Sequence, residues 1–326
     1  MNSRLKKVLP SFENKNILVL GDIVLDIFTY GESKENPEHS APCIVRNREE
    51  YTLGGAANVA NNIASLNAIP YLFGVVGDDY YGKKLESICS DNHIGLVGFY
   101  DLENPTIVKQ RIMHGNEQLL RLDIGEEKKR KIGKNIEDKV WDKLKQSINH
   151  KIFDFIIMSD YNKGFFTEKL SEEIIKLANS VGIRTLVDPK PCNINFFKKC
   201  TLICPNKHEA EKITNINYSA NKNNLIKIGE KLSEIVASEY VVITCGEDGT
   251  FSYCTKTKKY EFVQTVAKKV YDVTGAGDTF AATLALGLSS GLPIHDASRL
   301  ANYAAGIVVE KPGTAVPTLS ELRYKL

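Results

Sequence analysis

The stretch Val270–Leu286 (VYDVTGAGDTFAATLAL) combines a glycine-rich turn, an acidic residue and a run of small apolar residues. We expect a short strand that ends at Tyr271 and a helix that opens at Gly275-Ala276-Gly277, with Asp278 in its first turn. The unpaired N–H groups and the dipole of such a helix start favour bound phosphate.

An acid in the same turn repels phosphate, so the position of Asp278 needs a chemical reason. One reason is that Asp278 accepts the proton of an attacking hydroxyl group. The N–H groups of Gly275, Ala276 and Gly277 would then stabilise the charge that develops on a transferred phosphoryl group. The alternative is that Asp278 only complements the helix dipole and that the glycines only form the turn.

The elements that must position this turn alternate between strand and helix. Buried-strand patterns such as Asn16–Leu20 and Phe153–Met158 are interleaved with amphipathic helices such as Thr167–Ser180. This order predicts an α/β fold with a mostly parallel sheet covered by helices on both faces. Ligands bind beyond the carboxyl ends of the strands in such sheets. Polar residues follow the predicted strands at that edge: Asp22, Asp160, Asp188, Lys190, Asn206 and Thr244.

Two early motifs add candidate ligand-binding residues. Asp22 and Asp26 lie in GDIVLD after the first predicted strand, where they either reach a ligand or cap a turn. Gly54 and Gly55 precede a predicted helix and allow a small ligand to approach the backbone. Asn58, on the first turn of that helix, can hydrogen-bond sugar hydroxyl groups. Close packing of the helix on a strand is the alternative reason for these small residues.

Two segments, at about residues 27–53 and 96–123, lose the helical period and indicate β structure. The second contains Thr106–Met113 and Gln118–Asp123 around a turn at residues 114–117, which predicts a hairpin. Together the segments predict a small β lid inserted in a single α/β domain that spans residues 1–326. Closure of a lid excludes water from an activated phosphoryl group.

The composition argues against several classes of protein. A hydrophobic content of 43%, 25% charged residues and a net charge of +2 fit a globular protein without a nucleic-acid partner. The first ten residues are too polar for a signal peptide, and no apolar run could span a membrane, so we expect a cytoplasmic protein with no membrane partner. The seven cysteines lack CxxC spacing, which favours free thiols. Neither a Walker A motif nor a dinucleotide fingerprint is present, which disfavours a nicotinamide-dependent oxidoreductase.

The motifs VTGAGDTF, LGGAANVANNIA and PNKHE resemble those of the ribokinase-like (PfkB-type) carbohydrate kinases, from about Asn16 to Pro317. Within that family, the ordered set GDIVLD, GGAANVANNIASL, SDYNKG, VDPK and YDVTGAGDT is most similar to the D-glycero-β-D-manno-heptose 7-phosphate kinases. The resemblance implies a ribokinase-like fold. It also implies ATP-dependent phosphorylation of the heptose at O1, giving the 1,7-bisphosphate for ADP-heptose and surface polysaccharide synthesis.

The resemblance further implies roles for individual residues. Asp278 would be the catalytic base, and the backbone of Gly275, Ala276 and Gly277 the anion hole. The substrate-binding candidates are Asp22, Asp26, Gly54, Gly55, Asn58, Lys109, Arg111, Asp160 and Lys190. The nucleotide-binding candidates are Asn206, Glu209, Thr244, Gly246, Gly249, Asn302 and Gly313. Asn206 and Glu209 would also organise Mg²⁺ through water, and Asp272 with Thr274 matches a loop for a monovalent cation such as K⁺.

A sugar that carries its own phosphate also needs cations, which Lys109, Arg111, Lys163 and Lys190 could supply. The chain departs from the heptose kinases at Asn36–Pro42, where they carry Ser-Pro-Glu-Ala-Pro. That segment belongs to the predicted lid, so the identity of the sugar stays open.

The alternatives are a PfkB-type kinase for another sugar, sugar phosphate or nucleoside, and a non-catalytic sugar or nucleotide sensor. The chain ends at Leu326 without the nucleotidyltransferase domain that is fused to this kinase in many bacteria, so we expect a separate enzyme for the next step. Exposed sheet surface on the lid predicts a homodimer formed through two lids.

Overall fold

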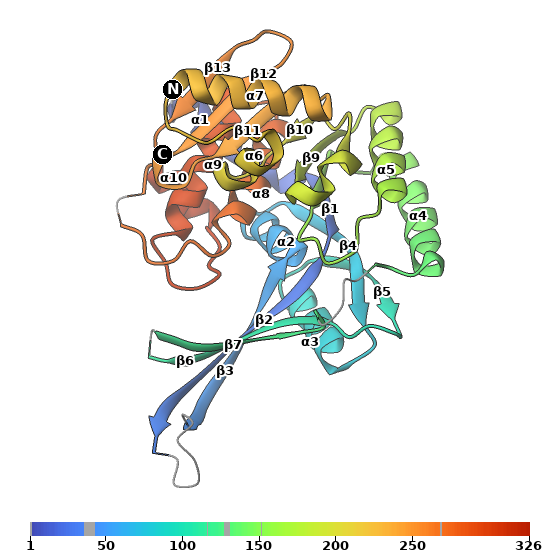
Figure 1. Cartoon of the computed structure of the whole chain (residues 1–326), viewed down its shortest axis with the longest axis vertical. Helices are drawn as coiled ribbons and strands as arrows, with labels where there is room; N and C mark the ends of the chain where they lie inside the picture. Colours follow the sequence, from blue (N-terminus) through green and yellow to red (C-terminus); the bar gives the residue numbers. More distant parts are fainter. Residues whose placement is uncertain (1, 36–42, 116, 127–130, 151, 268) are drawn as a thin grey trace.

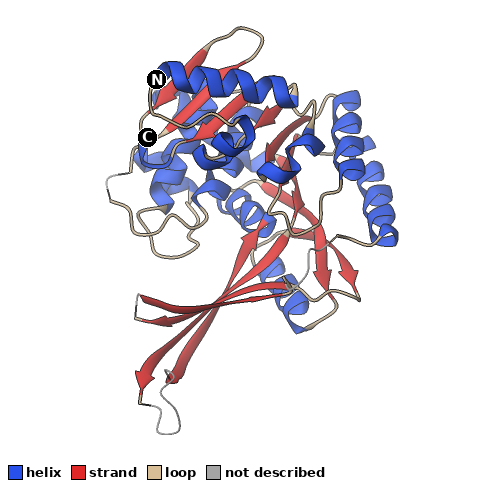
Figure 2. Ribbon diagram, viewed as in Figure 1, coloured by secondary structure: helices blue, strands red, loops and turns tan. Residues whose placement is uncertain are grey.

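A computed structural model of the chain describes residues 2–35, 43–115, 117–126, 131–150, 152–267 and 269–326. Helices surround a large sheet in the main body, and a second sheet projects from that body as an arm (Figure 1, Figure 2). The departure predicted at Asn36–Pro42 lies outside the described residues.

Within the described residues, nine strands form the main sheet in the order β13-β12-β11-β10-β9-β8-β1-β4-β5. All neighbouring pairs from β11 to β5 are parallel, and β12 is antiparallel to both of its neighbours. This arrangement confirms the predicted α/β class with a mostly parallel sheet. The strands are β1 (Asn16–Gly21), β4 (Ile69–Gly77), β5 (Gly95–Asp101), β8 (Phe155–Ser159), β9 (Arg184–Asp188), β10 (Leu202–Ile203), β11 (Tyr240–Thr244), β12 (Thr250–Cys254) and β13 (Tyr260–Val263).

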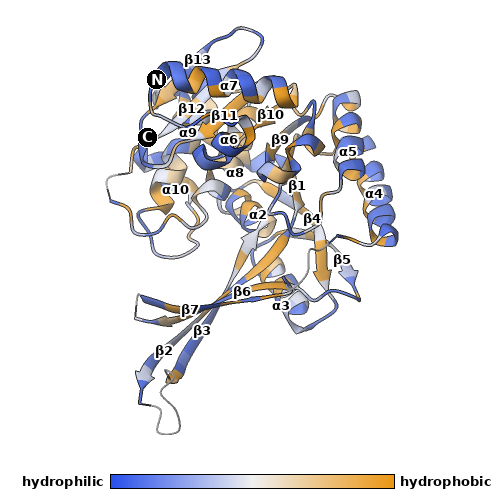
Figure 3. Ribbon diagram, viewed as in Figure 1, coloured by the Kyte–Doolittle hydropathy of each residue, from blue (hydrophilic) through white to orange (hydrophobic). Residues whose placement is uncertain are grey.

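Alternation of side chains along β1 explains why helices cover both faces of this sheet. Ile17 and Val19 belong to one buried cluster, whereas Leu18 and Leu20 belong to another. Helices of the first cluster include α2 (Ala56–Ser65), α8 (Ala276–Ser289) and α9 (Ile294–Val308). Helices of the second include α4 (Lys134–Asn149), α5 (Glu168–Val181) and α7 (Lys222–Val236). Hydrophobic residues of α4 and α5 face the sheet, and hydrophilic residues cover the outer surface of these two helices (Figure 3).

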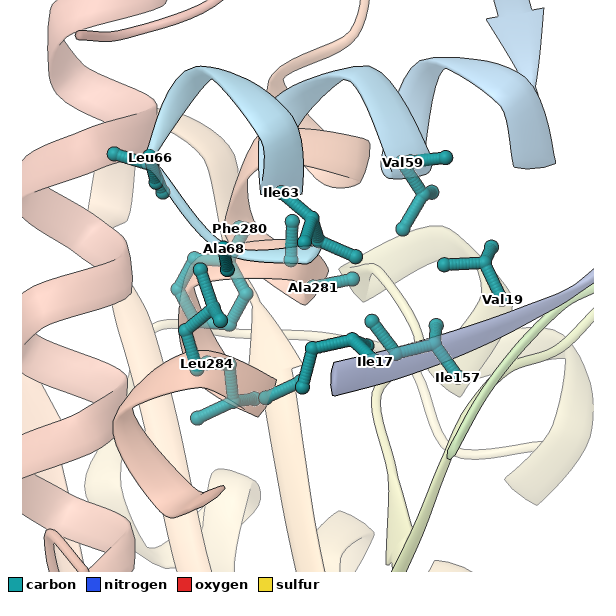
Figure 4. Close-up of a cluster of buried hydrophobic side chains, with 14 of the residues drawn as sticks. Ile17, Val19, Val59, Ile63, Leu66, Ala68, Ile157, Phe280, Ala281 and Leu284 are labelled. Carbon is teal, nitrogen blue, oxygen red and sulfur yellow. The ribbon is translucent and has the colours of Figure 1, made fainter. Parts of the chain in front are cut away.

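Packing in the first cluster fixes α2 and α8 relative to each other. Ile63 of α2 and Phe280 and Leu284 of α8 lie beside Ile17 of β1 and Ile157 of β8, and each is at most 2% exposed (Figure 4). Burying a side chain of this size stabilises the fold by about 1.5–3 kcal/mol. The two helices that carry Asn58 and Asp278 are therefore held as one unit.

The other helices are shorter or lie at the periphery. They are α1 (Asn2–Val8), α3 (Tyr80–Asp91), α6 (Lys207–Thr214) and α10 (Leu319–Lys325), with 3-10 turns η1 (Leu9–Asn14), η2 (Pro191–Phe197) and η3 (Gly246–Asp248). The sequence patterns did not predict α1 or α10. None of the helices in the described ranges is both long and apolar enough to cross a membrane.

The second sheet has the strand order β3-β2-β6-β7. Its strands are β2 (Ile23–Lys34), β3 (Cys43–Gly55), β6 (Ile107–His114) and β7 (Glu117–Ile124). β2 and β3 pair antiparallel, as do β6 and β7, and β2 and β6 pair in parallel. The antiparallel pairing of β6 with β7 confirms the predicted hairpin.

The predicted start of the second lid segment, near residue 96, was wrong. Residues 95–101 form β5, which pairs in parallel with β4 at the edge of the main sheet. Leu96 packs on the first core cluster, and Val97 and Phe99 pack on the second, so both faces of β5 are covered. This two-sided apolar environment is typical of a parallel strand and explains the apolar run.

The strand predicted to end at Tyr271 was also wrong, because residues 269–275 form no strand. Val270, Tyr271 and Val273 are 58–68% exposed. The N–H group of Tyr271 donates instead to the carbonyl oxygen of Val309. A loop attached to the end of α9 therefore leads into α8.

Candidate active site

A pocket of about 150 Å³ lies beside the start of α8, at the carboxyl ends of β8 to β11. β1 lies between β4 and β8, so the strand order reverses near this edge, where parallel α/β sheets bind ligands. The residues that line the pocket are Tyr161, Asp188, Lys190, Cys204, Asn206, Glu209, Thr244, Gly275, Gly277, Asp278 and Ala281.

Asp278 lies in the first turn of α8 and is 5% exposed. One carboxylate oxygen, Oδ2, accepts a hydrogen bond of 2.7 Å from Asn58 Nδ2. The other, Oδ1, accepts one of 2.7 Å from the hydroxyl group of Tyr161. Burial raises the pKa of Asp278 to about 6, and these two hydrogen bonds oppose that rise. A carboxyl group with this pKa can accept a proton near neutral pH.

The turn before Asp278 leaves backbone donors facing the pocket. Gly275 has a φ of 79°, and a Cβ atom there would lie 2.8 Å from Asn58 Nδ2, so this position requires glycine. A Cβ atom at Gly277 would meet nothing within 4 Å. Within the described part of the chain, the N–H groups of Gly277 and Asp278 have no hydrogen-bond acceptor. These donors are available to an anion.

The opposite wall of the pocket is charged. Asn206 and Glu209 form a capping box at the start of α6, and Lys190 Nζ lies 2.5 Å from Glu209 Oε1. Burial and, next, the charge of Glu209 raise the pKa of Asp188 well above its usual range. Burial alone would lower the pKa of Lys190, but its hydrogen bond to Glu209 raises that pKa.

The acceptor groups on this wall fit a magnesium ion that keeps part of its water shell. Carboxylate oxygens such as those of Asp188 and Glu209 are the ligands that Mg²⁺ prefers, and a cation there would offset their repulsion. A cage of three or more Asp, Glu, His or Cys side chains does not occur among the described residues. The site therefore suits an ion shared with phosphate groups and water, rather than one enclosed by protein.

Strands of the second sheet bring the predicted cations to the same region. Asp26 Oδ1 forms an ion pair of 2.5 Å with Arg111 Nη1. Lys109 lies opposite Asp26 in the register of β2 with β6. A Cβ atom at Gly54 would lie 2.2 Å from Asp26 Oδ2, so glycine leaves room for that carboxylate. Lys109 Nζ lies 5.5 Å from the centre of the Tyr161 ring.

Asp22 and Asp160 organise the loop that follows β8. The Asp22 carboxylate accepts from the N–H groups of Tyr161, Lys163 and Phe165 at 2.9–3.0 Å. Asp160 accepts from the N–H group of Lys190 at 3.0 Å. These contacts agree with the turn-capping interpretation of Asp22 and place neither residue in the lining of the pocket. Gly55 starts α2, where a Cβ atom would lie 2.4 Å from the carbonyl oxygen of Asp22.

Most of the other predicted nucleotide and cation positions lie in loops outside the pocket lining. Thr244 lines the pocket. Gly246 opens η3, and Gly249 follows it with a φ of 114°. Asn302 Nδ2 donates to the carbonyl oxygen of Gln264 at 2.7 Å, and Gly313 lies in the loop after α9. Asp272 Oδ1 accepts from the N–H group of Thr274 at 2.9 Å.

Sequence reasoning gave no site role to Tyr161, Asn62 or Thr279, although each belongs to the hydrogen-bond network around Asp278. Tyr161 directly follows Asp160 at a strand end, so its position was a usable signal. Asn62 and Thr279 lie on helix faces that otherwise carry apolar residues, where a polar side chain needs a partner.

Comparisons with known proteins agree with this geometry. Residues 14–321 match the pfkB family of carbohydrate kinases. The chain is 38% identical over 315 residues to bifunctional protein HldE of Helicobacter hepaticus, covering 95% of this chain and 63% of that protein. It is 36% identical over 317 residues to bifunctional protein HldE of Wolinella succinogenes, covering 97% and 65%. The chain thus belongs to the pfkB family of carbohydrate kinases, which are ATP-dependent phosphotransferases with an alcohol group as acceptor.

Solved structures confirm the predicted ribokinase-like fold. Phosphofructokinase-2 from Escherichia coli is similar with a TM-score of 0.77 at 16% identity, over 95% of this chain and 97% of that one. Ribokinase from Arabidopsis thaliana, in complex with ribose and ATP, is similar with a TM-score of 0.73 at 17% identity, over 95% and 98%. The chain spans less than two thirds of the length of the two HldE relatives above.

Asp278→Asn is expected to stabilise the fold at neutral pH. The folded-state pKa of Asp278, about 6, exceeds its ordinary value of 3.8, so the folded state binds more protons between these values. The contribution of Asp278 to stability therefore falls as pH rises from about 4 to about 6. Urea unfolding should give Asp278→Asn a free energy of unfolding ~3 kcal/mol above wild type at neutral pH. The difference should vanish near the ordinary pKa of the carboxyl group.

Asp142→Asn, on the exposed face of α4, is the matched control and should not change stability at either pH. Equal stability of Asp278→Asn and wild type at neutral pH would contradict a charge held in an unfavourable environment.

Proposed function

We propose that this chain is a kinase domain that phosphorylates D-glycero-β-D-manno-heptose 7-phosphate at O1 with ATP. The observation that carries the proposal is the buried Asp278, which faces the pocket beside the unpaired N–H groups of Gly277 and Asp278. The heptose substrate is supported by the ordered motifs in the sequence and by the 36–38% identity to HldE proteins. Residues 1–326 would act as one domain, with the second sheet as its lid.

In the proposed mechanism Asp278 accepts the proton of the O1 hydroxyl group as that oxygen attacks the γ-phosphorus of ATP. The bond from the γ-phosphorus to the bridging oxygen breaks, and ADP leaves. The backbone N–H groups of Gly277 and Asp278 stabilise the charge on the transferred phosphoryl group, whereas the N–H group of Ala276, also predicted for the anion hole, already donates to the carbonyl oxygen of Val273. Positioning and charge neutralisation supply most of the rate enhancement in such reactions.

Mg²⁺ bound with ATP would neutralise charge on the nucleotide phosphates. Asp188, Asn206 and Glu209 would hold it, partly through water, because their oxygens line the pocket. Thr244, Gly246, Gly249, Asn302 and Gly313 remain the proposed nucleotide positions. Asp272 and Thr274 remain a proposed site for K⁺. The cytoplasm is the proposed location, where ATP is available and the seven cysteines would stay free, as they are in the structure.

Lys109 is the cation that we assign to the 7-phosphate. Arg111 is paired with Asp26, Lys163 with Glu126 and Lys190 with Glu209. Within the described residues, no carboxylate lies within salt-bridge distance of Lys109. Burial lowers the pKa of Lys109, and a dianionic phosphate beside it would oppose that shift.

The first experiment is ADP release on a panel of acceptors with ATP and Mg²⁺. The panel contains heptose 7-phosphate, fructose 6-phosphate, ribose, mannose phosphates and a nucleoside. We expect a strong preference for heptose 7-phosphate, and Asp278→Asn should lower kcat by roughly 10²–10⁴-fold while ATP binding is retained.

Preference for another acceptor would keep the kinase chemistry and overturn the heptose assignment. Normal turnover by Asp278→Asn would remove Asp278 from its role as base. Ligand binding without turnover on any acceptor would instead favour the non-catalytic sensor.

Lys109→Met tests the phosphate assignment. Loss of one charge-assisted hydrogen bond should raise KM for heptose 7-phosphate by about 10–100-fold. KM for the same heptose without its phosphate should change little, because that sugar never contacts the ammonium group.

The matched control is Lys145→Met, on the exposed face of α4, which should leave both constants unchanged. An equal rise of KM for both sugars after Lys109→Met would show that Lys109 does not recognise the phosphate.

The second sheet is the proposed dimer interface. Leu120 and Leu122 on β7 and Val45 on β3 are 44–54% exposed, although they are large apolar side chains at the two edges of this sheet. Pairing of two lids would cover them. Light scattering should give the mass of a dimer at micromolar concentration, and Leu120→Asp should shift it to the monomer.

Leu102→Asp is the control, because Leu102 is 83% exposed but lies outside the second sheet. It should leave the dimer intact. A monomeric mass for the wild-type chain would overturn the interface.

A further inference from the structure

Two hydrogen-bond donors from distant parts of the chain hold the Asp278 carboxylate. Asn58 Nδ2 reaches Oδ2 from α2, and the Tyr161 hydroxyl group reaches Oδ1 from the loop after β8, each at 2.7 Å. Both donors are held in turn by further contacts, so neither is simply free to rotate away.

The orientation of the Asn58 amide follows from a chain of acceptors behind it. The main-chain carbonyl oxygen of Asn58 can only accept, and Asn62 Nδ2 donates to it at 2.8 Å. Asn62 must therefore turn its oxygen the other way, toward the Thr279 hydroxyl group at 2.6 Å, which donates to it. Asn62 Nδ2 also lies 3.4 Å from Asn58 Oδ1. This leaves the NH₂ group of Asn58 as the group that meets Asp278.

Tyr161 is fixed by the loop that carries it. The Asp22 carboxylate accepts from its backbone N–H group at 3.0 Å. Lys109 and Lys190 lie 5.5 and 5.4 Å from the centre of its ring. Burial and the charge of Asp278 raise the pKa of Tyr161 well above its ordinary value, so the phenol stays protonated and remains a donor.

We propose that Tyr161 and the chain Thr279–Asn62–Asn58 are positioning residues that clamp both oxygens of Asp278. Each carboxylate oxygen has two lone-pair directions, and the clamp occupies one on each. The remaining directions are available to the hydroxyl proton of a substrate in the pocket that Asp278 lines. Asp22 acts through Tyr161 and does not need to touch the sugar. The proposal rests on the proposed role of Asp278 as base.

The clamp also sets the charge state of the base. Burial favours the protonated carboxyl group, and Asp26 and Asp188 add negative charge to the surroundings of Asp278. The two donated hydrogen bonds and Lys190 favour the ionised form. Removing one donor should therefore raise the pKa of Asp278 and leave less of the base ionised near neutral pH.

Tyr161→Phe tests the first donor, because it removes one hydroxyl group and keeps the ring. The acid limb of the kcat–pH profile should move upward by about one pH unit. The ¹³C carboxyl signal of Asp278, assigned by its loss in Asp278→Asn, should titrate with the same shift in the free protein. A lower kcat with an unmoved acid limb and titration would mean that Tyr161 is merely structural.

Thr279→Val tests the far end of the chain with a side chain of the same shape. Thr279→Val should shift the acid limb of the kcat–pH profile and the ¹³C titration of Asp278 in the same direction as Tyr161→Phe, by a smaller amount. Thr279→Ser, which keeps the hydroxyl group, should give wild-type values of both. The matched control is Thr283→Val, one turn along α8, because the buried Thr283 hydroxyl group has no hydrogen-bond partner among the described residues. This control should titrate as wild type.

Wild-type titration in both Tyr161→Phe and Thr279→Val would overturn the clamp. Thermal unfolding of each variant checks that it is folded. The outcome is separable from the proposed function: if no sugar is phosphorylated, the kinase assignment fails, whereas the ¹³C titration still decides whether the clamp exists.

Discussion

The burial of one carboxylate, Asp278, is the constraint on which the rest of the site depends. A charge in that environment needs donors with fixed geometry, and no single element of the fold can supply them. Asn58 comes from α2 and Tyr161 from the loop after β8, separated from Asp278 by 220 and 117 residues in the chain. The parallel sheet brings these elements together, because α2 and α8 pack on the same face and β8 ends beside them.

Opposite charges are paired on two sides of the pocket. On the side of the second sheet, Arg111 offsets Asp26 and leaves Lys109 available. On the side of α6, the charge of Lys190 offsets that of Glu209. The Asp188 carboxylate lies close to Glu209, and no hydrogen-bond donor to it occurs among the described residues. Tyr161 lies between the two sides, and one lysine from each side, Lys109 and Lys190, lies near its ring. The proposed function would use this division, with the phosphorylated acceptor on one side and the metal-bound nucleotide on the other.

Much of the fold could be predicted from the sequence, because the spacing of apolar residues along a segment indicates which of its faces is buried. The alternation along β1 and the glycine turn before α8 are local signals, and both led to correct elements. The apolar run at residues 95–101 was assigned to the wrong sheet, since a pattern reports burial but does not name the partner strand. The run that ends at Tyr271 looked like a strand, but it pairs with no strand, and the N–H group of Tyr271 donates to the carbonyl oxygen of Val309 in a loop.

The same limit applies to the site. The type and position of Asp278 are visible in the sequence, and the motif resemblance supplied a role that remains a proposal. Asn58 was a predicted site residue and Tyr161 follows a predicted strand, but their hydrogen bonds to Asp278 could not be predicted, because a contact between side chains more than a hundred residues apart leaves no local pattern. Asp22 shows a second limit: an acid after a strand suggested either a ligand contact or turn capping, and its oxygens accept from three backbone N–H groups, as turn capping requires, while its contact with a sugar stays a prediction.

The parallel pairing of β2 with β6 has a consequence for how the chain is made. In sequence, α2, β4, α3 and β5 lie between these strands, so the hairpin of β2 and β3 leaves the ribosome long before β6. Until then one edge of β2 exposes unpaired backbone groups, which is a template for wrong pairing. Contacts so distant in sequence also slow folding. Lys109 and Arg111 therefore reach the site only when this late strand closes the second sheet during synthesis.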